Sequence, residues 1–297
     1  MSNVAKSDSD IRKEAEAIAR QSDILGHVRW IELEPEVIDQ RQIAYIEDEK
    51  GRPYAVFSLS SPCSPDLEAR DLQLASIARR ILGPDLQTVI PKPLVSGRIR
   101  GLSFGIHPWF DRASKSKWRW PIQRHFLVPK VLEWLRNATR KTSRNAGREI
   151  LAPLRLLASD PEIDSWLKDE ANQALKRLET DQWKPKQVLA HNDLWKGNIL
   201  INSLGSSGFV IIDWASSSPD GYGIYDLISF ALSCRLSRRT LLKELRTHCE
   251  ILGCDLVDAK SHLAASLAML LARLDNFPKV RFLEKAQSCF ERLASFY

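Results

Sequence analysis

One stretch, residues 191–213, constrains the fold more strongly than any other part of the chain. Two short apolar runs, Ile199–Ile201 and 209–212, flank the turn-rich segment 202–208. This pattern predicts two buried strands joined by a hairpin loop. Because a hairpin pairs its two strands, the residues just outside both strands are expected to lie close together.

Three polar side chains stand at the outer ends of these strands. Asp193 and Asn198 precede the first strand and have four residues between them, and Asp213 directly follows the second. Phosphoryl transfer requires such a set, because one carboxylate must accept or orient the proton of the acceptor hydroxyl. A second carboxylate and an amide oxygen must hold Mg²⁺ against the nucleotide phosphates. A surface loop with helix-capping Asp and Asn is the alternative, and it does not explain all three positions.

The amino-acid sequence of this region also contains a known motif. The chain reads HNDLWKGNIL at 191–200, IIDW at 211–214 and GIYD at 223–226. The first segment contains the spacing of a kinase catalytic loop, H-x-D-x-x-x-x-N. Together the three segments resemble the aminoglycoside phosphotransferase and choline kinase-like family, which has a protein-kinase-like fold. The close resemblance covers about residues 185–232, and the rest of the chain matches in layout only.

The resemblance implies a role for each of these residues. Asp193 would be the catalytic base, and Asn198 and Asp213 would bind Mg²⁺ next to ATP. His191 would brace the catalytic loop, and Asp226 would stabilise it. The cofactors implied are therefore ATP and Mg²⁺.

The remaining elements follow the expected order for such a fold. Apolar and alternating runs predict strands at 28–33, 41–46, 54–59 and 102–106, with a helix at 66–82, and helices predominate from 126 onward. We therefore expect an α+β, bilobal protein-kinase-like fold. Its parts would be a tail with an accessory helix (1–24), a small, mainly β N-terminal lobe (25–106), a hinge (107–112) and a larger, mainly helical C-terminal lobe with the catalytic loop (113–297).

The N-terminal lobe departs from the family pattern at two places. The strand expected at 54–59 has no Lys to reach the α- and β-phosphates. Glu68 and Asp71 on the next helix are candidates for the acidic partner of that Lys, or belong to a solvated helix face. The loop 34–39 has three carboxylates and no Gly, and carboxylates repel a triphosphate. Either this loop points away, or ATP is held differently, or ATP is not the ligand.

Two cations could replace the missing lysine. Lys196 lies three residues after Asp193, where a γ-phosphate would bind, although a solvated loop lysine is an equally good interpretation. Arg41 opens the second expected strand. We include Lys196 with Asp193 and His191 among the candidate catalytic residues.

The segment after the last strand of the N-terminal lobe fits a hinge. Backbone groups of Ile106 and His107 are expected to bind the adenine ring, and Trp109 and Phe110 belong either to the hinge or to the core. The basic, aromatic stretch 114–120 either lines a groove for phosphate or nucleic acid or forms a surface connection.

Composition limits the class of protein. The 297 residues carry a net charge of +6, which suits an anionic ligand such as ATP and does not by itself indicate nucleic acid. The apolar runs are too short to span a bilayer, the N-terminus lacks the apolar core of a signal peptide, and the five Cys form no C-x-x-C pair. We expect a cytoplasmic, reduced protein without a membrane partner, and the sequence does not indicate an oligomeric state.

The sequence predicts an ATP- and Mg²⁺-dependent phosphotransferase that acts on a hydroxyl of a small molecule. Aminoglycosides are polycations, and a site for them should be acidic. The expected acceptor region is instead basic, so we expect a neutral or anionic, sugar-like acceptor. The cations behind this expectation are Arg235, Arg238, Arg239, Arg246, Lys141, Arg144 and Arg148. The alternative, motivated by the missing strand lysine, is a pseudokinase that serves as a binding or scaffold module.

Overall fold

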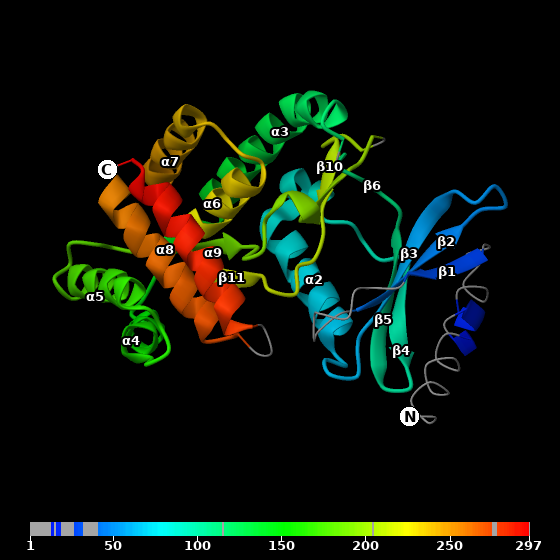
Figure 1. The fold of residues 1–297 in the computed structure, drawn as a ribbon, viewed down its shortest axis with the longest axis horizontal. Coiled ribbons are helices and arrows are strands. Elements are labelled where there is room, and N and C mark those ends of the chain that lie inside the picture. The colour runs from blue at the N-terminus through cyan, green and yellow to red at the C-terminus, as the bar shows by residue number, and fades with distance from the viewer. Residues whose placement is uncertain are drawn as a thin grey trace.

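The structure, a computed structural model, describes residues 13–14, 16–18, 27–31, 41–114, 116–203, 205–274 and 278–296. A sheet stands at one side of the molecule and a mass of helices at the other (Figure 1), which confirms the predicted bilobal α+β fold. The sheet is antiparallel with the order β1-β2-β3-β5-β4. Its strands are β1 (His27–Ile31), β2 (Gln42–Glu47), β3 (Pro53–Leu59), β4 (Val95–Ile99) and β5 (Leu102–Pro108).

Strand alternation gives this sheet two different faces. Ala44 and Ile46 on β2 join Phe57 on β3 in the buried core of the small lobe. Their neighbours Ile43 and Tyr45 point to the other face, which lines a cleft toward the large lobe. Because side chains of a strand alternate between faces, one strand serves both the core and the cleft.

Helix α2 (Leu67–Leu86) belongs to both lobes. Its first turn carries Glu68, which reaches the sheet, whereas Ala78 and Leu82 are buried in the hydrophobic core of the large lobe. The helix is interrupted at Gly83, which has a φ of 65° and precedes Pro84. The helix predicted at 66–82 therefore ends where this interruption begins. The large lobe therefore holds this helix in place. A short 3₁₀ turn, η1 (Gln87–Val89), follows it.

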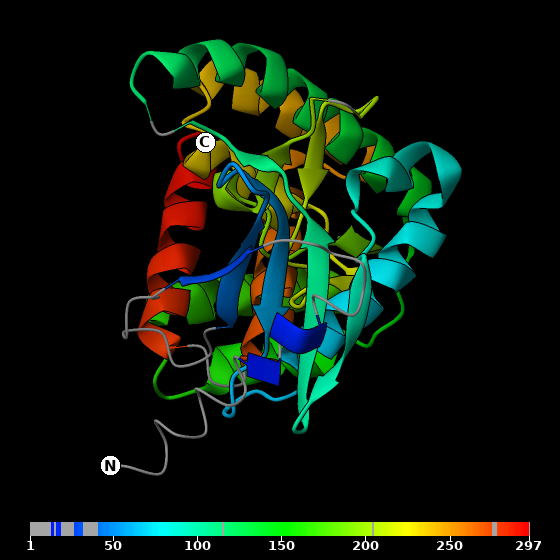
Figure 2. The same ribbon diagram turned by 90° about the vertical axis from the view of Figure 1, so that its right-hand side faces the viewer.

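The large lobe is mainly helical, as predicted. Figure 2 shows α3 running along one end of it, and α8 and α9 pack against each other. Its largest fully buried side chains include Trp183, Trp214 and Tyr222. The helices are α3 (Arg119–Thr142), α4 (Leu151–Ser159), α5 (Ser165–Glu179), α6 (Ile224–Ser233), α7 (Arg238–Leu252), α8 (Leu256–Leu271) and α9 (Lys279–Ala294).

Two small antiparallel sheets carry the loops of the large lobe. The predicted hairpin is present as β9 (Ile199–Ile201) and β10 (Phe209–Ile211), which β6 (Asp111–Arg112) extends on the other side of β9. The second sheet contains β7 (Arg144–Asn145), β8 (Lys186–Ala190) and β11 (Ser218–Gly221). The turn η2 (Lys196–Asn198) leads into β9.

Several element boundaries differ from the sequence prediction. Helix α3 begins at Arg119 and not near 126, because Pro121 lies in the first helical turn, where the N–H that proline lacks needs no partner. It extends to Thr142, so Lys141 is part of the helix. Strand β5 includes His107 and Pro108, the first two residues of the segment expected as a hinge.

Two expectations fall wholly or partly outside the described residues. The acidic loop 34–39 is one of them, and most of the accessory helix expected near the N-terminus is the other. Within the described part of the chain, no helix is both long and apolar enough to cross a membrane.

Candidate active site

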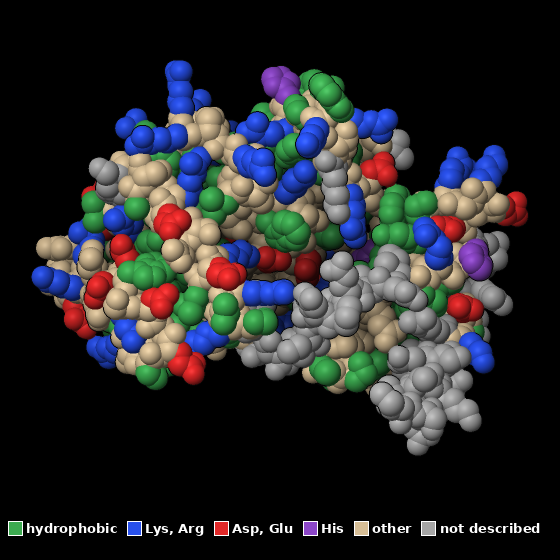
Figure 3. Space-filling model, viewed as in Figure 1, with side chains coloured by type: hydrophobic (Ala, Val, Ile, Leu, Met, Phe, Trp, Pro, Cys, Tyr) green, Lys and Arg blue, Asp and Glu red, His purple; other side chains and the backbone are tan. Residues whose placement is uncertain are grey.

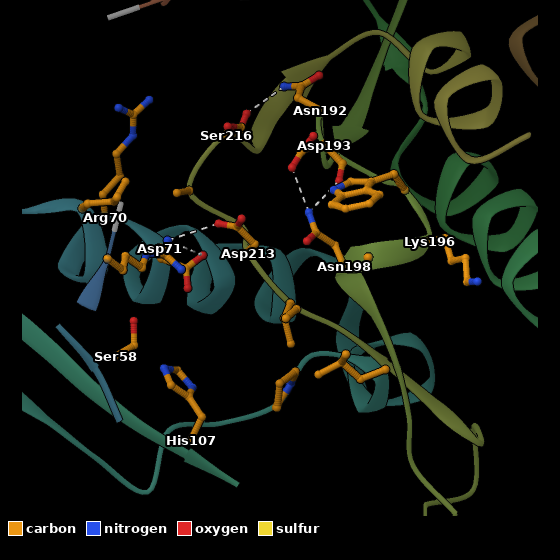
Figure 4. A pocket seen from close by; sticks show the side chains of 18 of the residues that line it. Ser58, Arg70, Asp71, His107, Asn192, Asp193, Lys196, Asn198, Asp213 and Ser216 are labelled. Carbon is orange, nitrogen blue, oxygen red and sulfur yellow. Dashed lines mark hydrogen bonds and ion pairs between the residues drawn. The ribbon is translucent and has the colours of Figure 1, made fainter. Parts of the chain in front are cut away.

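A cleft of about 1260 Å³ lies between the sheet and the large lobe. Residues of β2, β3 and β5 line one side, and the catalytic loop, α8 and α9 line the other. The three residues singled out from the sequence, Asp193, Asn198 and Asp213, all line this cleft (Figure 4). The hairpin β9–β10 brings them together, as its register predicts.

The amide of Asn198 has a fixed orientation. Its Nδ2 donates to the Oδ2 of Asp193 at 2.8 Å and to the backbone oxygen of Asp193 at 2.9 Å. The amide oxygen therefore points away from Asp193, toward the side of Asp213 (Figure 4). The backbone of Asn198 is also held, because the Ile212 N–H donates to its carbonyl at 3.0 Å.

Asp226 and His191 brace the catalytic loop from behind. The buried Asp226 carboxylate accepts the N–H groups of His191 at 2.7 Å and Asn192 at 2.8 Å. The His191 Nδ1 accepts the Asp193 N–H at 3.3 Å, so its Nε2 carries the proton and donates to the Ile212 carbonyl at 3.1 Å. Burial raises the pKa of Asp226, which these donors and His191 oppose. His191 is 2% exposed and its side chain does not line the cleft, so it positions the loop.

Two residues of the site have a left-handed backbone. Asn192 and Asp213 both have a φ of 65°, a conformation that costs about 1–3 kcal/mol and that Asn and Asp tolerate better than most residues. Asn192 is held there by Asp226 and by a hydrogen bond from its Nδ2 to the Ser216 carbonyl at 3.0 Å.

Arg41 places its guanidinium beside three carboxylates. Its Nη2 lies 3.1 Å from Asp213 Oδ1, and its Nε lies 3.4 Å from Glu68 Oε2. Asp71 Oδ1 is 3.9 Å from the same guanidinium. On β3, Ser58 donates its hydroxyl to Glu68 Oε2 at 2.7 Å. One arginine from the edge of β2 therefore joins two carboxylates of α2 to the expected metal-binding Asp213.

The carboxylates around Arg41 outnumber its single positive charge, so this part of the cleft favours a further cation. Burial raises the pKa of Asp71 to about 6, and Arg41 opposes the shift. Burial also acts to raise the pKa of Glu68, but the hydrogen bond with His107 and the charge of Arg41 outweigh it, so this pKa is lowered. Three carboxylates thus surround one guanidinium, and Figure 3 shows acidic side chains gathered in the hollow between the lobes.

The oxygen donors of Asn198 and Asp213 suit Mg²⁺, which also takes ligands from phosphate and water. The Asn198 amide oxygen and the Asp213 carboxylate are oxygen ligands of the type Mg²⁺ prefers. In the described part of the chain, no group of three or more His, Cys, Asp or Glu is arranged to hold a metal ion. A site with two protein ligands suits an ion that also takes phosphate oxygens and water.

Two predicted site residues are not where we expected them to act. The Lys196 ammonium lies 3.6 Å from the centre of the Trp120 ring and donates to the Ser114 carbonyl at 3.2 Å. Figure 4 shows it pointing away from Asp193 and Asn198, although Lys196 lines the cleft, so its phosphate contact stays a prediction. Ile106 is wholly buried within the sheet, and its carbonyl accepts the Leu94 N–H at 2.7 Å. These contacts do not support adenine binding by Ile106.

His107 does reach the cleft, with a different contact from the one predicted. Its Nε2 lies 2.7 Å from Glu68 Oε1, so the ring helps to orient Glu68. The cleft next to it is lined by Pro108, Trp109 and Phe110, which follow His107 in the chain.

The cations behind the expected basic acceptor face do not line the cleft. All seven are exposed, and they lie on outer surfaces of the large lobe. Arg144, for example, pairs with Asp220, and Arg238 donates to the Ser295 carbonyl. That expectation therefore rested on the wrong residues, because sequence alone does not show which side of a helix faces a cleft.

Lys285 on α9 is the site residue that the sequence did not reveal. Its Nζ lies 2.9 Å from Asp193 Oδ1 and 5.5 Å from the centre of the Tyr225 ring. Burial acts to lower the pKa of Lys285, but Tyr225 and Asp193 outweigh it and raise this pKa. Lys285 is separated from Asp193 by 92 residues, and a lysine in an amphipathic helix gives no signal of its own.

Comparisons with known proteins identify the fold. No family model and no curated protein matches the sequence. Among solved structures, an aminoglycoside 2'-phosphotransferase-IIIa in its GDP complex has a TM-score of 0.56 at 14% identity, over 94% of this chain and 97% of that chain. The choline kinase LicA from Streptococcus pneumoniae has a TM-score of 0.55 at 13% identity, over 95% and 99%.

A third similar structure is a choline/ethanolamine kinase family protein from Mesorhizobium loti. Its TM-score is 0.53 at 14% identity, over 97% of this chain and 93% of that chain. At such identities the similarity shows the fold. The chain thus has the protein-kinase-like fold of the small-molecule kinases, in agreement with the resemblance seen in the sequence.

Proposed function

We propose that the protein is a phosphotransferase that transfers the γ-phosphoryl group of ATP, with Mg²⁺, to a hydroxyl of a small neutral or anionic acceptor. The observation that carries this proposal is the convergence of Asp193, Asn198 and Asp213 in one cleft, with Asn198 fixed by Asp193. Phosphoryl transfer depends mainly on positioning and on charge stabilisation, and this set supplies both.

Aliphatic side chains of both lobes line the cleft, and these suit a nucleotide base. Ile43 and Val56 line it from the sheet, and Leu200 and Ile212 line it from the large lobe. Aliphatic side chains favour a flat ring, and residues 108–110 line the same cleft. Two of the similar structures carry a nucleotide in their names, GDP in one and AMP in the other.

The chain's own residues divide the work of the proposed reaction. Asp193 accepts the proton of the acceptor hydroxyl as its oxygen attacks the γ-phosphorus and the bond to the β,γ-bridging oxygen breaks. Asn198 keeps the Asp193 carboxylate oriented through its amide N–H. Asn198 and Asp213 would hold Mg²⁺, which neutralises phosphate charge when bound. Arg41 fixes Asp213 through their ion pair.

A pseudokinase is the second candidate. Lys285 and Arg41 pair with Asp193 and Asp213 in this structure, and such pairs could hold the site in a silent state. The absence of a lysine on β3 is a weaker reason for this candidate, however, because Arg41 places a cation beside Glu68 and Asp213. We therefore favour the enzyme.

Asp193→Asn tests the proposal. We expect turnover to fall by about 10²–10⁴-fold, because the amide cannot accept the proton, whereas binding of ATP with Mg²⁺ should persist. ADP release over a panel of hydroxyl acceptors measures turnover, and thermal shift with nucleotide measures binding. Asp85→Asn, at an exposed position outside the cleft, is the control. Turnover of Asp193→Asn within about threefold of wild type would contradict the assignment.

A further inference from the structure

The end of the cleft formed by α8 and α9 differs from the end that faces the sheet. Met269 and Leu270 on α8 and Phe282 on α9 line it, and the buried Tyr225 ring lines it from α6. These side chains offer apolar and aromatic surface to a ligand. The two helices lie side by side (Figure 1), and Lys285 of α9 contacts Asp193 of the catalytic loop.

The charges at this end are mostly positive. Lys285 and Arg273 line it, and Arg273 Nη1 lies 3.5 Å from the Ser218 hydroxyl. Among the described residues that line the whole cleft, the carboxylates are Asp71, Asp193 and Asp213. Asp71 and Asp213 belong to the Arg41 cluster, which leaves Asp193 as the acid nearest to Lys285.

Lys285 lies beside the Asp193 oxygen that an acceptor hydroxyl would bind. Asp193 Oδ2 is held by the Asn198 amide, and Oδ1 faces the Lys285 ammonium at 2.9 Å. A carboxylate oxygen accepts more than one hydrogen bond, so an acceptor hydroxyl can bind Oδ1 beside Lys285. Any group on a carbon next to that hydroxyl is then within reach of the ammonium.

We propose, building on the proposed function, that the acceptor is a hydroxy acid with an apolar body, and that Lys285 selects it by binding the carboxylate beside the reacting hydroxyl. A carboxylate next to the negative Asp193 requires a cation between them, and Lys285 is in that position. The apolar body lies against Met269, Leu270 and Phe282.

The same lysine acts against cationic acceptors. An ammonium group on the carbon beside the hydroxyl would lie next to Lys285, and like charges in a partly buried site reduce both affinity and encounter rate. Aminoglycosides, choline and ethanolamine all carry such cationic groups. This chain therefore departs in charge preference from the proteins whose fold it shares.

Three matched probes separate charge from shape. 3-Phenyllactate is anionic, 3-phenyllactamide is neutral and 1-amino-3-phenylpropan-2-ol is cationic. Each carries its hydroxyl on the carbon between a benzyl group and the group whose charge varies. Their binding is measured by calorimetry, with and without a non-hydrolysable ATP analogue and Mg²⁺. For the wild-type protein we expect the anion to bind about tenfold more tightly than the amide, and the cation to bind more weakly than the amide.

Lys285→Met should bring the ratio of the two affinities, anion to amide, to within about threefold of one, because only the anion binds the ammonium. The ratio within one variant cancels effects of the substitution on Asp193 that both probes share. Lys285→Arg should keep the ratio, since it keeps the charge. Lys279→Met is the control, because this lysine is on the same helix and pairs with Asp160 and Glu162 outside the cleft.

Two results would overturn the inference. One is wild-type protein that binds the amide or the cation as tightly as the anion, and the other is an unchanged ratio in Lys285→Met. Phosphoryl transfer is measured separately with the same probes. Anion-selective, Lys285-dependent binding without transfer to any acceptor would remove the proposed function and leave the binding site standing. Phosphoryl transfer to the amide or the cation in preference to the anion would support the proposed function and contradict the inferred preference for a carboxylate.

Discussion

His262 on α8 shows how one residue can set the response of the fold to acid. The ring is fully buried against Trp183, and neither nitrogen has a hydrogen-bond partner among the residues that the structure describes. Burial lowers the pKa of His262 to about 3, and the charge of Lys186 adds to the shift. The folded state therefore resists protonation of this ring, whereas the unfolded chain takes up the proton near pH 6.5.

The sign of the pH effect follows from this difference. Above about pH 6.5 the ring is neutral in both states, and His262 adds no pH dependence. As the pH falls from about 6.5 toward 3, the free energy of unfolding decreases by up to about 1.4 kcal/mol per pH unit. His262→Phe should remove this loss, so its stability relative to wild type should rise by about 2 kcal/mol between pH 7.5 and 5.

Urea unfolding at both pH values measures this effect. His125→Phe serves as the control, because His125 is exposed on α3 and should leave the pH dependence unchanged. Parallel stability curves for wild type and His262→Phe would show that His262 is not the acid-sensitive group.

The sequence predicted the site residues whose chemistry is encoded locally. Asp193, Asn198 and Asp213 lie within 21 positions, and the apolar runs between them predicted the hairpin that joins them. Arg41 and Lys285 were not assigned their contacts, because Arg41 is 172 residues from Asp213 and Lys285 is 92 residues from Asp193. Contacts over such separations depend on how the lobes and helices pack, and no periodicity in the sequence records that packing.

Among the elements, the turn η2 and the start of α3 form one unit. Lys196 in η2 joins them, since its ammonium lies over Trp120 of α3 and donates to the Ser114 carbonyl. Its backbone N–H also donates to the Ser233 hydroxyl at 3.0 Å, at the end of α6. The residue therefore anchors the catalytic loop to two helices, a role that could not be predicted from its place in the motif.

Lys196→Met distinguishes this anchoring role from the predicted phosphate contact. If the ammonium only stabilises the turn, the substitution should weaken ATP and ADP to the same extent, by less than about threefold, and lower the stability by about 1 kcal/mol. Titration of both nucleotides and thermal unfolding measure these effects. A selective loss of ATP affinity would instead support the γ-phosphate contact expected from the sequence.

Element boundaries were predicted well where side-chain periodicity is strong and poorly where proline decides them. The strands at 42–47 and 53–59 agree with the sequence to within about one residue at each end, because their alternation is clear. The start of α3 was missed by several residues, because Pro121 is tolerated in a first turn and reads as a break elsewhere. Local pattern thus identifies elements more reliably than their ends.

At the scale of the whole molecule, Arg41 connects the small lobe to the large one. It directly precedes β2, whereas its partners Glu68 and Asp71 are on α2, whose later turns are buried in the core of the large lobe. Asp213, the third partner, follows β10. One guanidinium therefore fixes the sheet relative to the catalytic loop and closes the side of the cleft where Mg²⁺ would bind.

Comparing Arg41→Met with Arg41→Lys should separate the effect of Arg41 on stability from its effect on turnover. It leaves Glu68 and Asp71 buried without their cation, and removing one partner of a buried ion pair costs about 3–5 kcal/mol. Arg41→Lys keeps the charge and should fold, but a lysine ammonium cannot contact Glu68 and Asp213 with the geometry of a guanidinium. We expect its kcat to fall by about tenfold or more, with nucleotide affinity reduced by less.

The surface pair of Arg52 and Asp48 provides the matched control. Arg52 also belongs to the small lobe and pairs with Asp48 at 2.9 Å, but its side chain is 71% exposed, so Arg52→Met should change stability by less than about 1 kcal/mol. Chemical unfolding and steady-state kinetics on the four proteins measure both effects. Equal stability losses in Arg41→Met and Arg52→Met, or unchanged kcat in Arg41→Lys, would show that Arg41 does not connect the lobes. The opposite pattern would show that Arg41 connects the lobes and that its ion pair with Asp213 supports turnover.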